Sequence, residues 1–194
     1  MINNLWIDIE TTGLDYNNDT IIELACIYNY TEFHEYCLPA KKPEIWEEIS
    51  GLTGLTWEFL EQNGVSEEIL YHKFLKFLDS KIDKYDKTEK LIFSGYKADF
   101  DKEFIRKLFI KNNNNFLGSY FLNINLDIMS IIAHYITQKQ ITEIFENYKL
   151  KTVCDFFKIN FKAHSALEDI KATKKIYEIM VKNENNNKKI SIKR

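Results

Sequence analysis

The chain has 194 residues, 45% of them hydrophobic, which fits one globular domain with a substantial core. Its longest apolar runs, such as Ile21-Ile22, fall far below the roughly 20 residues that a membrane-spanning helix needs. The formal charge of -3 excludes a protein that grips duplex nucleic acid through a broad basic surface, so any contact with nucleic acid is expected to be local. The first residues lack the basic start and apolar middle of a secretory leader, and we expect an intracellular, cytoplasmic protein with no membrane contact.

The cysteines predict buried, reduced thiols. Cys26, Cys37 and Cys154 each lie in a mostly apolar stretch, and none has a second Cys or a His at the spacing of a zinc site. A carboxylate cluster that binds divalent cations is compatible with the acidic charge, because such cations reverse the local field.

The first part of the chain predicts an antiparallel meander. Residues 4–10 alternate apolar and polar side chains, which is the period of a strand and places Asp8 and Glu10 on one face. Two further strand candidates follow at 20–29 and 32–39, after turn-forming residues.

The middle of the chain predicts helices with one more strand between them. Thr56 is expected to cap a short helix, and Ser66 a longer one with apolar residues at helical spacing. A short strand is predicted at 91–93, followed by a helix at 101–111. The asparagine run at 112–115 ends that helix, because Asn prefers turns and caps.

The last part of the chain predicts packing helices and a tail. Asp127 opens one helical pattern, and residues 150–157 form a shorter one. We expect one folded domain over residues 1–182 and a polar, disordered tail over 183–194. The clearest apolar stripe belongs to the last helix and consists of Ala166, Ile170, Thr173, Tyr177 and Met180.

Five polar residues have individually ordinary explanations. Two carboxylates at i and i+2 on a strand, such as Asp8 and Glu10, stand roughly 7 Å apart and can converge on one cation, but they also occur on half-exposed strands. Asp101 alone fits a helix cap, and His164 with Asp169 fits a polar pair near a helix start. Their combination and order change this interpretation.

The segment WIDIETTGLD resembles the D-x-E-T-T-G motif of the DEDDh exonucleases, the superfamily of the proofreading subunit of bacterial DNA polymerase III. GYKADFDKEFI resembles the second motif of this superfamily and aligns Asp101 with its third carboxylate. HSALEDIKAT is similar to the third motif, on His164 and Asp169. The resemblance covers roughly residues 4–180, so the domain at 1–182 is expected to be an exonuclease domain.

The resemblance implies an α/β, ribonuclease H-like fold, with a mixed five-stranded sheet of three antiparallel and two parallel strands flanked by helices. It also implies two Mg²⁺ or Mn²⁺ ions, which phosphodiester hydrolysis uses to activate water and stabilise the leaving oxygen. Asp8 would bridge both ions, while Glu10 and Asp169 would hold the ion with the nucleophilic water. Asp101 would support the other ion. His164 would take the proton of the water, since imidazole titrates near neutral pH.

The same resemblance assigns substrate-binding residues. The segment after the first two carboxylates would hold the terminal 3′-hydroxyl and press on the last base, with Leu14 as a wedge; it consists of Thr11, Thr12, Gly13 and Leu14. Tyr96 and Lys97 stand where the family often has His-Asn, which leaves substrate handling there open.

The sequence therefore predicts a metal-dependent 3′-to-5′ exonuclease that releases nucleoside monophosphates from single-stranded ends, with DNA favoured. An exoribonuclease similar to oligoribonuclease is the alternative within the same enzyme class, because the motifs do not separate the sugars. A non-catalytic nucleic-acid or replisome binding module is the alternative of another class, and the complete set of five residues argues against it. The expected partner is a single-stranded DNA or RNA 3′ end. A free-standing enzyme is favoured over a subunit bound to a polymerase or replisome.

Overall fold

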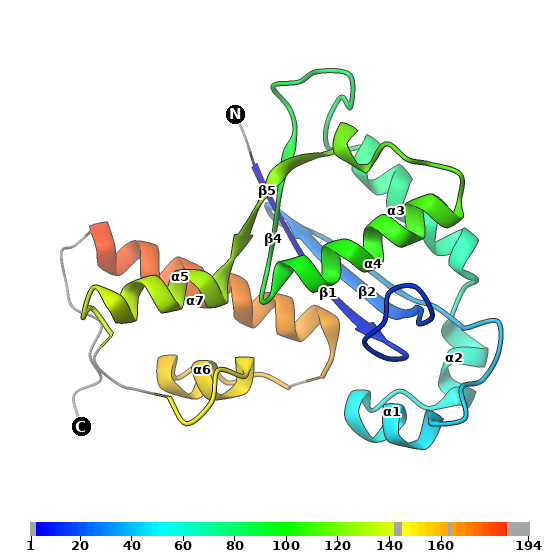
Figure 1. The fold of residues 1–194 in the computed structure, drawn as a ribbon, viewed down its shortest axis with the longest axis horizontal. Helices are drawn as coiled ribbons and strands as arrows, with labels where there is room; N and C mark the ends of the chain where they lie inside the picture. Colours follow the sequence, from blue (N-terminus) through cyan, green and yellow to red (C-terminus); the bar gives the residue numbers. More distant parts are fainter. Residues whose placement is uncertain (1–2, 142–144, 163, 186–194) are drawn as a thin grey trace.

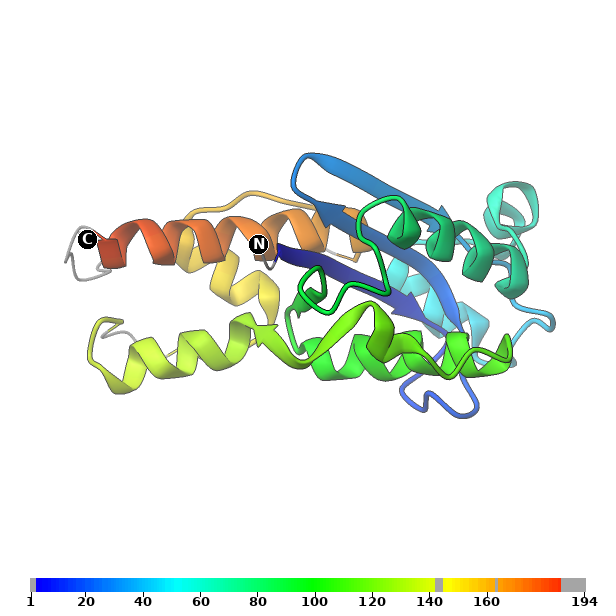
Figure 2. The same cartoon turned by 90° about the horizontal axis from the view of Figure 1, so that it is seen from above.

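The computed structural model describes residues 3–141, 145–162 and 164–185. One five-stranded sheet, in the order β3-β2-β1-β4-β5, forms the centre of the molecule, with helices on both of its faces (Figures 1 and 2). The pairs β1–β2 and β2–β3 are antiparallel, while β1–β4 and β4–β5 are parallel. This confirms the predicted ribonuclease H-like α/β arrangement. The strands are β1 (Asn3–Thr11), β2 (Ile21–Tyr28), β3 (Thr31–Tyr36), β4 (Leu91–Gly95) and β5 (Phe121–Asp127).

The helices divide between the two faces of the sheet (Figure 2). Helices α3 and α4 contribute to the hydrophobic cluster on one face, and α5, α6 and α7 contribute to the cluster on the other. A third, smaller cluster joins α1 and α2 to Ile22 at the start of β2. The helices are α1 (Trp46–Thr53), α2 (Trp57–Asn63), α3 (Glu67–Asp79), α4 (Ala98–Lys111), the short 3₁₀ helix η1 (Leu117–Ser119), α5 (Ile128–Thr137), α6 (Leu150–Phe157) and α7 (Ala166–Asn185).

The alternation of β1 decides where the carboxylates lie. Leu5 and Ile7 point into the cluster of α3 and α4, whereas Trp6 packs in the cluster of α7. Because side chains two apart on a strand share a face, Asp8 and Glu10 follow Trp6 toward α7. They stand near the C-terminal end of β1, beyond the apolar part of that cluster.

Most predicted boundaries are confirmed, and the differences have local causes. Thr56 and Ser66 cap α2 and α3 by accepting backbone N–H groups, as predicted. Helix α4 begins at Ala98, not at Asp101, because Lys97 adopts a left-handed conformation and starts the helix three residues earlier. Helix α1 and strand β5 were not located from the residue pattern.

The last helix is longer than predicted, and the cysteines are as predicted. Helix α7 continues to Asn185, past the predicted start of the tail at 183, while residues 186–194 lie outside the described residues. The predicted disorder of that tail stays a prediction. Cys26, Cys37 and Cys154 are free and buried, as expected. Within the described part of the chain, no helix is long and apolar enough to cross a membrane.

Candidate active site

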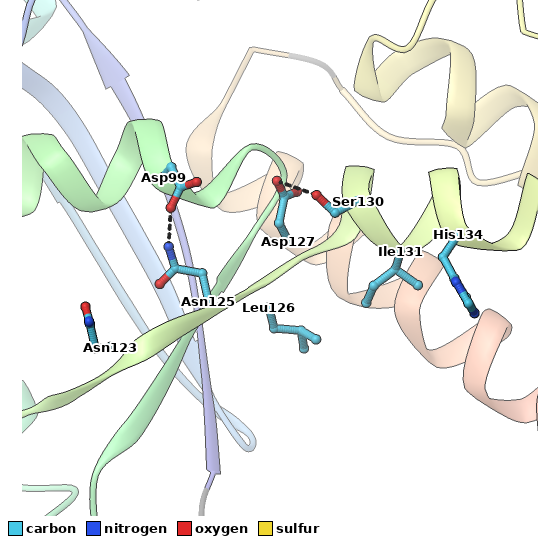
Figure 3. Close-up of a pocket in the computed structure, with 8 residues that line it drawn as sticks. All are labelled: Asp99, Asn123, Asn125, Leu126, Asp127, Ser130, Ile131 and His134. Carbon is cyan, nitrogen blue, oxygen red and sulfur yellow. Dashed lines mark hydrogen bonds between the residues drawn. The ribbon is translucent and has the colours of Figure 1, made fainter. Parts of the chain in front are cut away.

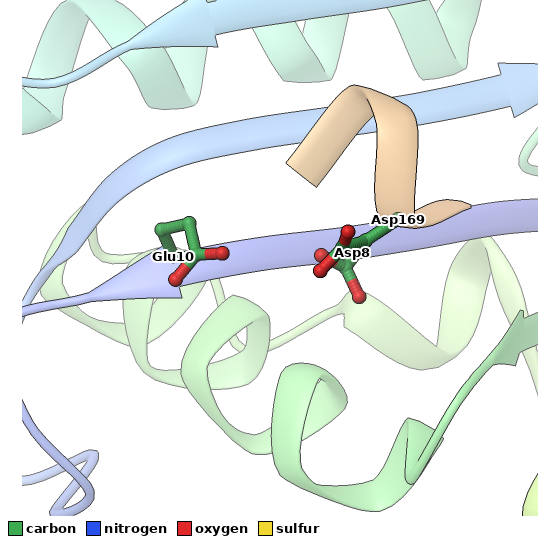
Figure 4. A group of neighbouring side chains, drawn as sticks. All are labelled: Asp8, Glu10 and Asp169. Carbon is green, nitrogen blue, oxygen red and sulfur yellow. The ribbon is translucent and has the colours of Figure 1, made fainter. Parts of the chain in front are cut away.

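Three carboxylates meet where β1 and α7 come together. Asp8 and Glu10 belong to β1, and Asp169 lies on the first turn of α7 (Figure 4). One oxygen from each of the three groups lies within 4.8 Å of the others. Helix α7 packs across β1 and β2, which brings two sequence motifs more than a hundred residues apart into one site.

Burial and neighbouring charges raise the pKa of all three acidic groups. Burial, followed by the charges of Asp101 and Asp169, raises the pKa of Asp8 well above its ordinary value. Burial and then the charge of Asp169 raise the pKa of Glu10 to about 8. The pKa of Asp169 rises to about 7, mainly through burial. Carboxylates held this close disfavour simultaneous ionisation unless a cation compensates their charge.

Asp101 lies beside this group, on the first turn of α4. Its side chain is only 4% exposed, and its charge is the largest electrostatic influence on the pKa of Asp8. The backbone N–H of Ile9 donates a hydrogen bond to its carboxylate, which joins α4 to β1. Asp101 does not share the oxygen cluster formed by the other three carboxylates in the described part of the chain.

His164 lies on the rim of an adjacent cavity of about 500 Å³. It is exposed, and its backbone has a φ of 66°, in the left-handed region that residues other than glycine rarely adopt. Its backbone N–H donates a hydrogen bond to the Asp169 carboxylate. The backbone of His164 is thereby attached to the acidic group, and the residue also lines the cavity. The cavity is lined by Glu23, Tyr36, Lys162, Ser165, Phe59 and residues 51–56.

The residues present fit divalent cations. The Oδ1 atom of Asp169 is buried and has no hydrogen-bond partner among the described residues, although buried polar atoms are normally paired. A cation between Asp8, Glu10 and Asp169 would supply the missing partner. The donor set consists of carboxylate oxygens alone, which suits Mg²⁺ or Mn²⁺ better than softer ions.

The turn after β1 presents a rigid backbone and one exposed apolar side chain. The Thr11 hydroxyl donates to the Gly13 carbonyl at 2.5 Å, and the Thr12 hydroxyl donates to Asp19 at 3.0 Å. A Cβ atom at Gly13 would lie 2.3 Å from Asp19 Oδ2, so a larger residue there would displace the Asp19 side chain that accepts from Thr12. Leu14 is 84% exposed at the tip of this turn.

Tyr96 and Lys97 occupy the start of α4 near the site. The Tyr96 hydroxyl donates to the Tyr148 carbonyl at 2.5 Å, which ties the end of β4 to the segment before α6. Lys97 is exposed, has a φ of 61°, and its backbone N–H donates to Asp127 at 3.1 Å. Hydrogen bonds therefore hold the Tyr96 side chain and the Lys97 backbone, while the lysine side chain faces solvent.

The sequence interpretation did not single out Glu23. This carboxylate is 1% exposed on β2 and pairs in register with Glu10 on the neighbouring strand. Its charge contributes to the raised pKa of Asp8, Glu10 and Asp169. One feature of the sequence could have revealed it, since Glu23 interrupts the otherwise apolar run of β2. An acidic residue in a central strand is rarely buried unless it has a partner.

A second polar cavity, of about 510 Å³, lies between β5 and α5 (Figure 3). Asp127 accepts hydrogen bonds from the backbone of Met129 at 2.9 Å and from Ser130 at 3.3 Å, as a helix cap does. Asp99 accepts a hydrogen bond from Asn125. The carboxylates of this cavity are thus occupied in holding α5 and α4 to β5, and they do not form a second acidic site.

Comparisons with known proteins identify the family of the chain. Residues 5–177 match the family model RNase_T, described as exonuclease. The chain is 30% identical over 175 residues to a PolC-type DNA polymerase III of Caldanaerobacter subterraneus subsp. tengcongensis, and 28% identical over 177 residues to that of Thermotoga maritima. These alignments cover 88% of this chain but 11% of each polymerase, so the chain spans about a tenth of the length of these relatives.

Solved structures show the same fold. Exonuclease I from Methylocaldum szegediense superposes with a TM-score of 0.75 at 20% identity, over 98% of this chain and 42% of that chain. Exonuclease I of E. coli in complex with a dA16 oligonucleotide gives a TM-score of 0.72 at 18% identity, over 97% and 45%. The match to the family model, which extends over nearly the whole described chain, shows that this protein belongs to the RNase_T exonuclease family, within the DEDDh superfamily that its motifs resemble.

Proposed function

We propose that this protein is a metal-dependent 3′-to-5′ exonuclease that releases nucleoside monophosphates from single-stranded ends, with DNA as the favoured substrate. The convergence of Asp8, Glu10 and Asp169, in a chain of the exonuclease family, carries the proposal. Nucleases use such carboxylate groups because phosphodiester hydrolysis requires charge stabilisation on both sides of the phosphorus.

Each acidic residue has a distinct role in this proposal. Two Mg²⁺ or Mn²⁺ ions, when bound, supply an activated water and stabilise the leaving 3′-oxygen. Asp8 would bridge the ions because it is the most central carboxylate, affected by the charges of the other four acidic groups nearby. Glu10 and Asp169 would hold the ion on the side of the attacking water, and Asp101 the other. His164, at the cavity rim, would accept the proton of the attacking water.

The turn after β1 would hold the substrate end. The backbone and hydroxyl groups of Thr11, Thr12 and Gly13 would bind the terminal 3′-hydroxyl, and Leu14 would press on the last base. The position of Leu14 supports this role, because this exposed apolar side chain follows Glu10 by only four residues, on the turn after β1. DNA is favoured because the relatives include PolC-type DNA polymerases and an exonuclease I solved with dA16.

The catalytic unit would extend over residues 1–182. We favour a free-standing enzyme, and the relation to PolC makes a polymerase or replisome the alternative partner. Sedimentation of the purified chain with and without a polymerase subunit of the same cell would separate these two arrangements.

The decisive experiment follows degradation of single-stranded DNA and RNA labelled at the 3′ or the 5′ end, in Mg²⁺, Mn²⁺ or EDTA. We expect metal-dependent release of mononucleotides from the 3′ end, faster with DNA than with RNA. Asp169→Asn should abolish this activity, while Glu168→Gln, which changes a half-exposed neighbouring carboxylate, should retain it. Faster cleavage of RNA would establish the exoribonuclease alternative. Binding without release of nucleotides under all metal conditions would favour the non-catalytic module, and activity in EDTA would refute the mechanism.

A further inference from the structure

Glu23 is an unexpected neighbour for an acidic cluster. It lies on β2 directly across from Glu10, on the same face of the sheet, and its side chain is 1% exposed. Another buried carboxylate adds repulsion and desolvation cost to a site that already contains four. It does not belong to the group whose oxygens converge, so in the described structure it does not act as a fourth ligand of that group.

Two hydrogen bonds fix the orientation of Glu23. His34 on β3 has its Nε2 atom 2.7 Å from Glu23 Oε1, and the Ser165 hydroxyl donates to the same oxygen at 3.4 Å. His34 is partly exposed and stacks edge-on against Tyr36, which lines the cavity together with Glu23. The carboxylate therefore connects the edge of the sheet to the segment that precedes α7.

Ser165 stands between two residues of the candidate active site. It follows His164 directly, and its carbonyl accepts the backbone N–H of Asp169 at 2.8 Å. The backbone N–H of His164 in turn donates to the Asp169 carboxylate. His164, Ser165 and Asp169 thus form one hydrogen-bonded turn, and Glu23 is the side chain of the sheet that binds its centre.

We propose that Glu23 is a positioning residue that, oriented by His34, anchors Ser165 and so fixes the turn bearing His164 and Asp169 against β1. The left-handed backbone of His164 explains the need for an anchor, because a strained conformation persists only where its surroundings hold it. Asp8 and Glu10 belong to a central strand paired on both sides, whereas this turn belongs to the connection between α6 and α7. The inference deepens the proposed exonuclease function and rests on it.

Four variants test the anchor through turnover. Glu23→Ala and Ser165→Ala should each lower kcat by about tenfold with KM changed less than about twofold, because small displacements of a base and a ligand affect the reaction more than substrate binding. The double variant should be no worse than Glu23→Ala, since both changes break the same link. Glu23→Gln, which keeps an oxygen acceptor, should recover most of the lost activity. Additive losses in the double variant would overturn the proposal.

A readout that does not depend on activity separates this inference from the proposed function. Amide hydrogen exchange of the metal-free protein should be faster at residues 164–169 in Glu23→Ala and Ser165→Ala than in the wild type. Glu35→Gln, which removes an ion pair of 2.8 Å with Lys73 elsewhere on β3, should leave both exchange at 164–169 and kcat unchanged. If the wild type cleaves no nucleic acid but exchange at 164–169 is faster in Glu23→Ala and Ser165→Ala than in the wild type, the proposed function is refuted. The anchoring role of Glu23 is then retained.

Two further results would refute the anchor. The first is unchanged hydrogen exchange at 164–169 in folded Ser165→Ala, which would show that other contacts hold the turn. Ser165→Ala is chosen because Glu23→Ala could destabilise the sheet. Calorimetric titration with Mn²⁺ provides the other result. If Glu23→Gln weakens Mn²⁺ binding about a hundredfold while Ser165→Ala leaves it unchanged, Glu23 binds metal directly and is not a positioning residue.

Discussion

Replacing Asp169 by asparagine should stabilise the metal-free protein at alkaline pH while it removes the activity. The pKa of the Asp169 carboxyl rises from 3.8 to about 7 on folding, mainly through burial. Because the folded pKa is raised, its contribution to stability is present at low pH and is lost as the pH rises from about 4 through 7. An asparagine does not ionise and avoids this loss, and its amide can donate to the neighbouring carboxylates.

The size of the gain follows from the pKa difference. One pKa unit corresponds to about 1.4 kcal/mol, which gives an upper limit of roughly 4 kcal/mol above pH 7. Asp169 is only partly buried, so solvent screening reduces this to about 1–3 kcal/mol. For a chain of this size such a change shifts Tm by about 3–10 °C.

Thermal unfolding in EDTA at pH 5 and pH 8 measures the effect. We expect Asp169→Asn to raise Tm clearly at pH 8 and less than half as much at pH 5, while added Mn²⁺ raises the Tm of the wild type alone. Glu168→Gln is the matched control, because this half-exposed carboxylate stands one residue away and pairs with Lys171. Since its charge is the smallest of the named contributions to the raised pKa of Asp169, we expect a much smaller change in Tm from this variant. An Asp169→Asn variant no more stable than the wild type at pH 8, or stabilised equally at both pH values, would refute the electrostatic reasoning.

Three further changes give independent tests. Leu14→Ala should raise KM for single-stranded DNA about tenfold with little effect on Mn²⁺ affinity, because Leu14 is 84% exposed and, in the proposed function, presses on the last base of the substrate; steady-state kinetics with unchanged KM would contradict this. Thr173→Val should be neutral or stabilising by up to about 1 kcal/mol in urea unfolding, since the buried Thr173 hydroxyl has no described partner, and a clear loss of stability would reveal one. Tyr96→Phe should lower the free energy of unfolding by about 1 kcal/mol in the same assay, because the hydrogen bond to the Tyr148 carbonyl is lost; an unchanged free energy of unfolding would contradict this.

The local elements were predictable because their determinants are local. The alternation in 4–10 identified β1, and the hydroxyl groups of Thr56 and Ser66 marked helix starts, since capping depends on residues three apart. Helix α1 lacks a side-chain cap that would mark its start. Strand β5 is an edge strand with exposed residues, so it lacks a clear alternation of apolar and polar side chains. The start of α4 was misplaced because a left-handed Lys97 is unusual for a residue with a side chain.

The sequence by itself determined the four candidate metal ligands, Asp8, Glu10, Asp101 and Asp169, and the candidate base His164, because these residues stand within short motifs whose order and flanking residues identify the family. Only the tertiary structure decided how these motifs meet and what holds them. Glu23 and Ser165 are 142 positions apart, and no local pattern relates them. Their contact depends on the register of β2 against β1 and on the packing of α7 over both strands, which are long-range properties of the folded chain.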